Sequence, residues 1–322
     1  MIRTLYRSSK GGFTVDVPTT HWRVALHDEG GLFWVDFSEA PPEVVEPLLR
    51  DHFGFHPLVI NDVLREAYVA KIDNWGEYVY AVLHAVRFSA ETLGLVTREV
   101  DALLGKNYLV TYHAQPIHVI NQLWSASQND QRRLEGGPDH LLYLLLDLLT
   151  SEYMPVVDRI DETIDHLEDE VFERPTQHTL NTIFSVKRAV LHMRRIIGPQ
   201  REVLNRLARD DYAMIDPKDR VYFRDVYDHL VRLADINESL RDLIGGTLDT
   251  YLSVVSNRIN QVMKILTIFT ALFMPISFLA GFFGMNFTRL PFDNSPLLIG
   301  TLMVMVVTPI LMFLWFRHRG WI

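Results

Sequence analysis

The residues best suited to ion chemistry lie near the C-terminus, in a stretch that is otherwise apolar. Asn260, Thr270 and Ser277 carry amide or hydroxyl groups at spacings that suit one face of a helix. The whole face consists of Asn260, Met263, Leu266 or Thr267, Thr270, Met274, Ser277 and Gly281. In a membrane helix such residues belong at helix contacts or along water. The pattern therefore leaves two interpretations open, helix packing and the lining of a water-filled path.

Two apolar stretches are long enough to cross a membrane as helices. Residues 265–283 and 297–316 contain no charged residue, and each is close to the ~20 residues that span ~30 Å of hydrocarbon. The short connection 284–296 makes the two spans a helical hairpin. Basic residues flank its outer ends, namely Arg258, Lys264, Arg317 and Arg319. This bias predicts that both termini lie in the cytosol.

Composition excludes several classes of protein. The chain has 322 residues, a net charge of −9 and no cysteine, which excludes disulfides and thiolate metal sites. The negative charge argues against nucleic acid as a partner and suits a protein that handles cations. No nucleophile motif or phosphate-binding glycine loop occurs, so we expect no enzyme activity and no organic cofactor.

One long helix is predicted to lead into the first span. Between Asp219 and Phe283 the only proline is Pro275, and apolar residues recur near the helical period. A helix of ~65 residues would be roughly 100 Å long. Gly245 and Gly246 are a weak point where a bend is expected.

The rest of the chain predicts a mixed α/β domain followed by helices. Strand patterns occur at 13–17, 32–37, 77–88 and 107–113, and helical patterns at 41–53, 57–66 and 115–127. After Pro138 we expect only helix, including an acidic segment 158–173 and a basic segment 187–209 joined near Pro175. The predicted fold is an α+β membrane protein with an N-terminal α/β cytosolic domain, a long helical stalk and two C-terminal transmembrane helices. Its predicted domains are 1–136 (α/β), 137–263 (helical, with the stalk) and 264–322 (two spans).

The outer end of the first span resembles a known family signature. Gly284-Met285-Asn286 at this place is similar to the signature of the CorA family of magnesium channels, and the segments 222–229, 250–281 and 315–321 also resemble that family. The resemblance implies a homopentamer in the cytoplasmic membrane, with the five first spans around a pore for divalent cations. It implies a selectivity filter at Gly284, Met285 and Asn286 and pore-lining positions at Asn260, Met263, Leu266, Thr270, Met274, Ser277 and Gly281.

The chemistry of Mg²⁺ suits these residues. Mg²⁺ gives up its water reluctantly, so a ring of Asn286 carbonyls would accept hydrogen bonds from the water shell of a hydrated ion. Neither span contains Asp or Glu, which would hold a bare ion too strongly for quick release. Met274, Leu266 and Met263 would form an apolar constriction that closes by dewetting.

The resemblance also implies a regulatory cation site between neighbouring subunits. Asp225 and Asp228 fall at the family's sensing positions, where bound Mg²⁺ would hold the pore closed. The usual partner acid falls at Ser89-Ala90, with Glu91 beside it, so Glu91 is the candidate third ligand.

Two alternative functions remain open from the sequence. A zinc transporter of the ZntB branch has the same fold, although Met285 favours magnesium over zinc. A membrane-anchored sensor without transport would need an effector or catalytic domain, for which the sequence shows no motif. The choice among Mg²⁺, Co²⁺, Ni²⁺ and Zn²⁺ needs an uptake assay.

Overall fold

The computed structural model describes residues 1–285 and 295–321 of the chain. It divides into two compact units, Met1–Leu248 and Asp249–Ile322. A single helix, α8 (Arg220–Phe283), begins in the first unit and ends in the second.

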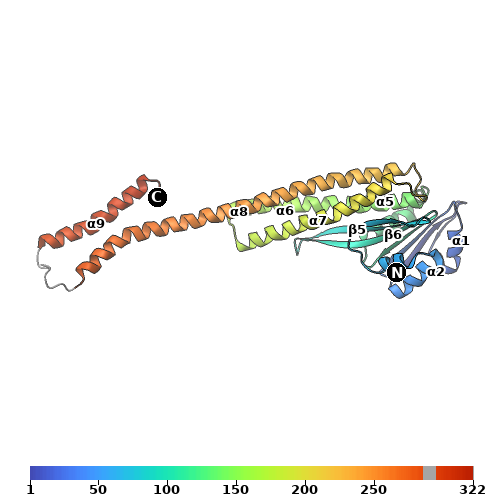
Figure 1. Ribbon diagram of the computed structural model, residues 1–322, viewed down its shortest axis with the longest axis horizontal. Coiled ribbons are helices and arrows are strands. Elements are labelled where there is room, and N and C mark those ends of the chain that lie inside the picture. Colours follow the sequence, from blue (N-terminus) through green and yellow to red (C-terminus); the bar gives the residue numbers. More distant parts are fainter. Residues whose placement is uncertain (286–294, 322) are drawn as a thin grey trace. The chain divides into compact units, whose positions relative to one another are not determined.

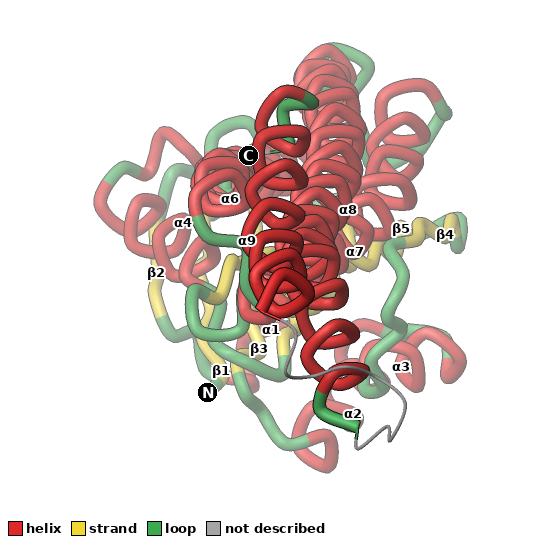
Figure 2. The backbone as a smooth tube through the Cα atoms, turned by 90° about the vertical axis from the view of Figure 1, so that its left-hand side faces the viewer, coloured by secondary structure: helices red, strands yellow, loops and turns green. Residues whose placement is uncertain are grey.

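A seven-stranded mixed sheet forms the centre of the first unit (Figures 1 and 2). Its order is β2-β1-β3-β7-β6-β5-β4, and neighbouring strands are antiparallel except β3 and β7. The strands are β1 (Ile2–Arg7), β2 (Phe13–Val15), β3 (Leu32–Ser38), β4 (Lys71–Asn74), β5 (Tyr78–Ser89), β6 (Gly94–Gly105) and β7 (Tyr108–His113). β5 and β6 pair along their full length, so their hairpin extends beyond β4 and β7.

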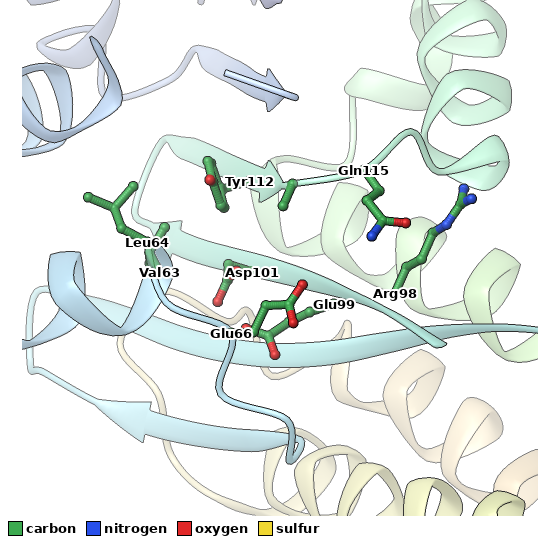
Figure 3. A pocket seen from close by; sticks show the side chains of 9 residues that line it. Val63, Leu64, Glu66, Arg98, Glu99, Asp101, Tyr112 and Gln115 are labelled. Atoms are coloured by element: carbon green, nitrogen blue, oxygen red, sulfur yellow. The ribbon is translucent and has the colours of Figure 1, made fainter. Parts of the chain in front are cut away.

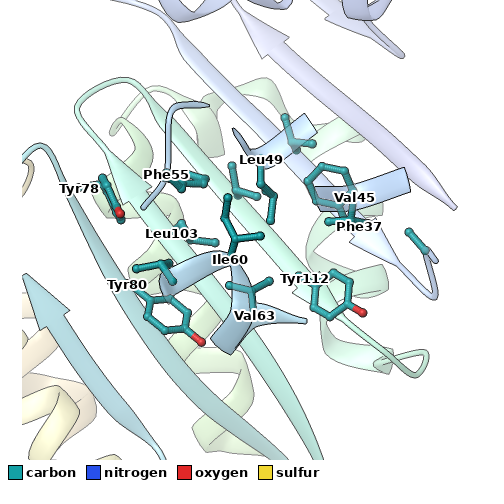
Figure 4. Packing of buried hydrophobic residues seen from close by; sticks show 14 of the residues in the cluster. Phe37, Val45, Leu49, Phe55, Ile60, Val63, Tyr78, Tyr80, Leu103 and Tyr112 are labelled. Atoms are coloured by element: carbon teal, nitrogen blue, oxygen red, sulfur yellow. The ribbon is translucent and has the colours of Figure 1, made fainter. Parts of the chain in front are cut away.

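Short helices cover one face of the sheet and enclose an apolar core (Figure 4). Trp22 packs edge-on against Phe33 with ring centroids 5.6 Å apart, and Leu49 and Ile60 lie over this face. The elements are η1 (Thr19–His21), α1 (Trp22–Leu26), α2 (Pro42–Phe53) and α3 (Pro57–Val63). α2 ends at Gly54, whose φ of 68° is the left-handed conformation that glycine adopts freely.

A second set of helices covers the other face (Figure 1). They are α4 (His118–Asn129), η2 (Gln131–Leu134), α5 (Pro138–Ser151), α6 (Tyr153–Glu173) and α7 (Gln177–Arg209). α7 begins with a capping box in which Thr176 and Thr179 satisfy each other's backbone N–H groups. His84 of β5 lies beyond the part of that strand that pairs with β4. The Tyr153 hydroxyl donates to the carbonyl of His84 at 2.8 Å, and the Gln200 side chain accepts from the N–H of His84 at 3.0 Å. These contacts satisfy the polar backbone of a strand edge that would otherwise be open.

The second unit contains the end of α8 and the whole of α9 (Ser295–His318). Ile268 and Phe316 are buried there, and Lys264 donates to the carbonyl of Gly320 at 3.1 Å. Near the C-terminal end of α8, Leu279 and Phe283 line a cavity of about 230 Å³ that α9 completes. Among the described residues, two helices are long and apolar enough to cross a membrane, α8 and Pro296–His318.

The structure confirms the predicted fold class and most predicted elements. The long helix runs unbroken through Gly245 and Gly246 as a 64-residue helix, and α6 and α7 are joined near Pro175 as predicted. The sequence patterns missed β1, β4, β6 and α1. The expectation of continuous helix after Pro138 was wrong at 211–219, where the chain turns and the N–H of Asp216 bonds to Asp139. The boundaries 1–136, 137–263 and 264–322 stay a prediction.

Candidate ion-conducting face and cytosolic acidic cluster

The residues predicted to line a pore share one exposed face of α8. Within the single chain, every one of the seven is solvent-exposed, and the apolar members Met263, Leu266 and Met274 are 55%, 57% and 65% exposed. Such a surface of large apolar side chains requires either lipid or further protein around it. The full set is Asn260, Met263, Leu266, Thr270, Met274, Ser277 and Gly281.

The opposite face of the same helix packs within the chain. Ile268 is buried, and Leu279 and Phe283 line the cavity shared with α9. Each lies two residues from a predicted pore position, and two residues turn a helix by about 200°. α9 therefore covers the side of α8 that faces away from Thr270 and Ser277, and it leaves the predicted pore face free.

The hydroxyl groups on this face keep their oxygen lone pairs available. Thr270 donates to the carbonyl of Leu266 at 2.9 Å, and Thr267 donates to that of Met263 at 2.8 Å. Each hydroxyl proton is thus used within the helix, and the oxygen can accept a hydrogen bond from water. This is the polarity that a hydrated cation needs, because its bound waters point their protons outward.

A polar stripe continues from Asn260 toward the start of the second unit. Asp249, Ser253 and Ser256 are exposed and follow the same three- and four-residue spacing. The sequence analysis missed these positions, although their spacing was the available signal. They extend the hydrophilic part of the candidate face by about three helical turns.

Two of the three predicted filter residues lie at the end of α8. The N–H of Gly284 bonds to the carbonyl of Ala280 at 2.9 Å, and that of Met285 bonds to Phe282 at 3.3 Å. A Cβ on Gly284 would lie 2.9 Å from the Ala280 oxygen, so a larger residue does not fit this turn without movement. Asn286, the third predicted filter residue, lies outside the described residues.

The predicted regulatory acids are exposed, but within one chain they do not form a cluster of three. Asp225 and Asp228 lie on the first turns of α8, and Glu91 lies in the turn between β5 and β6. Within one chain, the charges of Asp225 and His229 in α8 both act on Asp147 of α5. Burial, and next the charge of Asp225, raise the pKa of Asp147, while His229 lowers it. Among the described residues, no group of three His, Asp or Glu side chains is arranged to hold a metal ion.

A small cavity in the sheet domain collects three further acids (Figure 3). Glu66, Glu99 and Asp101 line a space of about 40 Å³, which is large enough for one or two waters and too small for an organic substrate. Glu99 accepts from the N–H groups of Ala67 and Tyr68 at 2.8 and 3.0 Å. Its hydrogen bonds hold the loop before β4 against the sheet, which is a structural role.

Comparisons with known proteins agree with this architecture. The family model described as "CorA-like Mg2+ transporter protein" matches residues 29–318. The cobalt/magnesium transport protein CorA of Thermotoga maritima is 35% identical over 314 residues, covering 96% of this chain and 88% of that protein. The chain belongs to the CorA family.

Other CorA relatives extend the comparison. The complete CorA magnesium transporter of Methanocaldococcus jannaschii superimposes with a TM-score of 0.85, covering 99% of this chain and 98% of that one at 22% identity. The zinc transport protein ZntB of Yersinia enterocolitica is 22% identical over 271 residues, covering 83% of this chain and 81% of that protein. The sequence thus lies nearer to the Thermotoga CorA than to this ZntB.

Membership in the CorA family fixes the broad class of function. CorA proteins are membrane transporters of divalent cations and not enzymes. The two apolar helices at the C-terminus are the candidate membrane spans of this chain. The predicted filter, pore-lining and regulatory residues remain predictions.

Proposed function

We propose that this CorA protein conducts hydrated Mg²⁺ into the cell through a pore shared by five copies of the chain. The observation that carries the proposal is the free face of α8 opposite α9, with Thr270 and Ser277 among exposed apolar residues. One helix cannot enclose a path, so the face needs identical faces around a symmetry axis. The Thermotoga relative is named a cobalt/magnesium transport protein, which supports Mg²⁺ as cargo, with Co²⁺ and Ni²⁺ as further ions.

In this proposal the selectivity filter contacts the water shell of the ion and not the bare ion. Five Asn286 carbonyls at the outer end of the first span would accept hydrogen bonds from first-shell waters, which Mg²⁺ keeps. Deeper along the path, Thr270 and Ser277 offer hydroxyl oxygens. Met263, Leu266 and Met274 form the narrow apolar part that closes when water leaves it.

The proposed placement puts both termini in the cytosol and the two spans in the cytoplasmic membrane. The loop 284–296 then lies outside, and basic residues such as Lys264 and Arg317 lie at the inner surface. Asp225 and Asp228 of one subunit, with Glu91 of a neighbour as the weaker candidate, would bind cytosolic Mg²⁺ and favour the closed pore. Bridging by a cation removes the repulsion between these carboxylates, so occupancy stabilises one interface geometry.

The filter is tested by Asn286→Ala. We expect this variant to lose Mg²⁺ uptake in proteoliposomes while it keeps its oligomeric mass and thermal stability, because the substitution removes only the side-chain amide that would contact the water shell of the ion. Asn294→Ala in the same loop is the matched control and should transport normally. Wild-type rates in Asn286→Ala would remove Asn286 from the filter.

Transport of zinc is the closest alternative function. Uptake of Mg²⁺, Co²⁺, Ni²⁺ and Zn²⁺ by the same proteoliposomes separates the two, since the proposal requires Mg²⁺ to pass and to compete with the other ions. A protein that moves Zn²⁺ and not Mg²⁺ would belong functionally with ZntB. A protein that moves no ion would support the membrane-anchored sensor.

A further inference from the structure

A hollow of about 630 Å³ lies between the β1–β2 turn and the end of α1. Ser9 and Lys10 line it from the turn, and Arg23, Val24 and His27 line it from α1 and the residue that follows. Its volume falls in the ~300–1,000 Å³ range of small-molecule sites. The hollow shares no residue with the candidate pore face or with the cluster around Asp225, so no function assigned above uses it.

Asp28 also lines this hollow, and its carboxylate is hydrogen-bonded to other groups of the protein. Oδ2 of Asp28 accepts hydrogen bonds from the hydroxyl of Tyr6 at 2.7 Å and from the N–H of Ser9 at 2.8 Å. The Tyr6 bond first, and then those from Ser9, lower the pKa of Asp28 to about 2. A Cβ on Gly31 would lie 2.8 Å from Asp28 Oδ2 and 3.0 Å from the carbonyl of Arg7, so glycine makes this approach possible. The carboxylate therefore shapes the turn.

The cationic groups around the hollow, by contrast, lack acidic partners. Among the residues that the structure describes, Lys10 and Arg23 make no ion pair and no side-chain hydrogen bond. His27 donates from Nδ1 to the carbonyl of Arg23 at 2.6 Å, which leaves Nε2 to donate to an anion when the ring is protonated.

We propose that this hollow binds a nucleoside polyphosphate. Lys10, Arg23 and His27 supply three donors from two elements to the phosphate oxygens, and charge-assisted hydrogen bonds of this kind are the strong ones. Val24 is 64% exposed beside them and offers an apolar surface to the base. Phosphate oxygens are also good ligands for Mg²⁺. A site of this kind would therefore respond to the concentration of Mg²⁺ that is bound to nucleotide phosphates.

Titration of ATP into the purified full-length protein in detergent, with EDTA present, tests the proposal by calorimetry. We expect saturable binding, and we expect Arg23→Glu to raise the Kd at least about tenfold, which corresponds to ~1.4 kcal/mol. Arg50→Glu, which changes an exposed arginine of α2 outside the hollow, should leave the Kd unchanged. Equal weakening by both variants, or no heat up to about 5 mM ATP, would overturn the site.

Inorganic triphosphate separates the two parts of the ligand. It should bind more weakly than ATP and lose affinity in Arg23→Glu to the same extent, because it meets the cations and not Val24. Equal affinity for both ligands would overturn the nucleoside part of the proposal. Thermal unfolding of each variant shows whether it is folded, and no step of the test depends on ion transport.

Discussion

Asp36 and Asp101 are both buried in the sheet, but their pKa values are shifted in opposite directions. Burial acts to raise the pKa of Asp36, but hydrogen bonding and charge from His113, with the charge of Arg3, outweigh it and lower the pKa overall. For Asp101, burial raises the pKa well above its usual range, the Tyr80 hydrogen bond opposes this, and the charge of Glu99 adds to it. Asp36 is thus an ionised partner in the core, whereas Asp101 favours the protonated form.

Asp101→Asn should stabilise the protein at neutral and higher pH. Asp101 is 2% exposed, and its Oδ1 accepts from the Tyr80 hydroxyl at 2.7 Å, a bond that the Asn carbonyl can keep. Because the folded-state pKa lies above the unfolded value, the folded state binds the extra proton, and wild-type stability falls as pH rises from the unfolded pKa to the folded pKa. The amide removes this loss.

Thermal unfolding followed by tryptophan fluorescence between pH 5 and 8 measures the effect. A gain of ~1 kcal/mol would raise the Tm by about 2–4 °C, and the gain should grow with pH. Asp73→Asn, at a half-exposed position on β4, which β5 separates from β6, is the control and should not show this pH dependence. A lower Tm for Asp101→Asn at pH 8 would show that the carboxylate is needed in its ionised form.

At the scale of the helix, the two faces of α8 should differ in access to water. The chain has no cysteine, so single cysteines can be introduced without a background reaction. We expect a charged methanethiosulfonate reagent to modify Thr270→Cys and Ser277→Cys and to block ion uptake. Ile268→Cys and Leu279→Cys, on the face that packs within the chain, are the matched controls and should stay unmodified. Equal modification of all four would contradict a separate water-lined face.

The same helix shows what a sequence pattern can predict. Its start, its end and its exposed stripe followed from periodicity and from the lack of proline between Asp219 and Pro275, because one helix obeys a local rule along its whole length. The strand β6 was missed because its inward residues include Glu99 and Asp101, which break the expected alternation of apolar and polar residues. The buried acids are held by partners from distant parts of the chain, and those partners cannot be read from local sequence.

The candidate sites also differ in whether local sequence could predict them. The predicted pore face lies on one helix and followed from residue spacing, whereas the electrostatic effect of Asp225 in α8 on Asp147 in α5 has no local signal. The hollow beside Asp28 likewise combines a turn with a helix that the sequence patterns did not predict. Asn286 lies outside the described residues, so its role depends on the resemblance and on the uptake test.

At the scale of the whole molecule, we expect cytosolic Mg²⁺ to limit its own entry through Asp225. Asp225→Asn removes one of the charges that a bridging cation would neutralise, so uptake by this variant should continue at internal Mg²⁺ concentrations that stop the wild type. Proteoliposomes loaded with increasing Mg²⁺ measure this, and Asp158→Asn, an exposed acid of α6, is the control. Wild-type uptake that is insensitive to internal Mg²⁺ would contradict the regulatory role.

The unbroken course of α8 from Arg220 to Phe283 has a further consequence for this transporter. Residues along one helix keep a fixed rotational phase, since every added residue turns the helix by about 100°. One alanine inserted after Ser256 would rotate Thr270 away from its direction relative to Asp249, whereas seven inserted residues would restore that direction to within about 20°. The candidate face therefore tolerates the insertion of a whole heptad better than the insertion of a single residue.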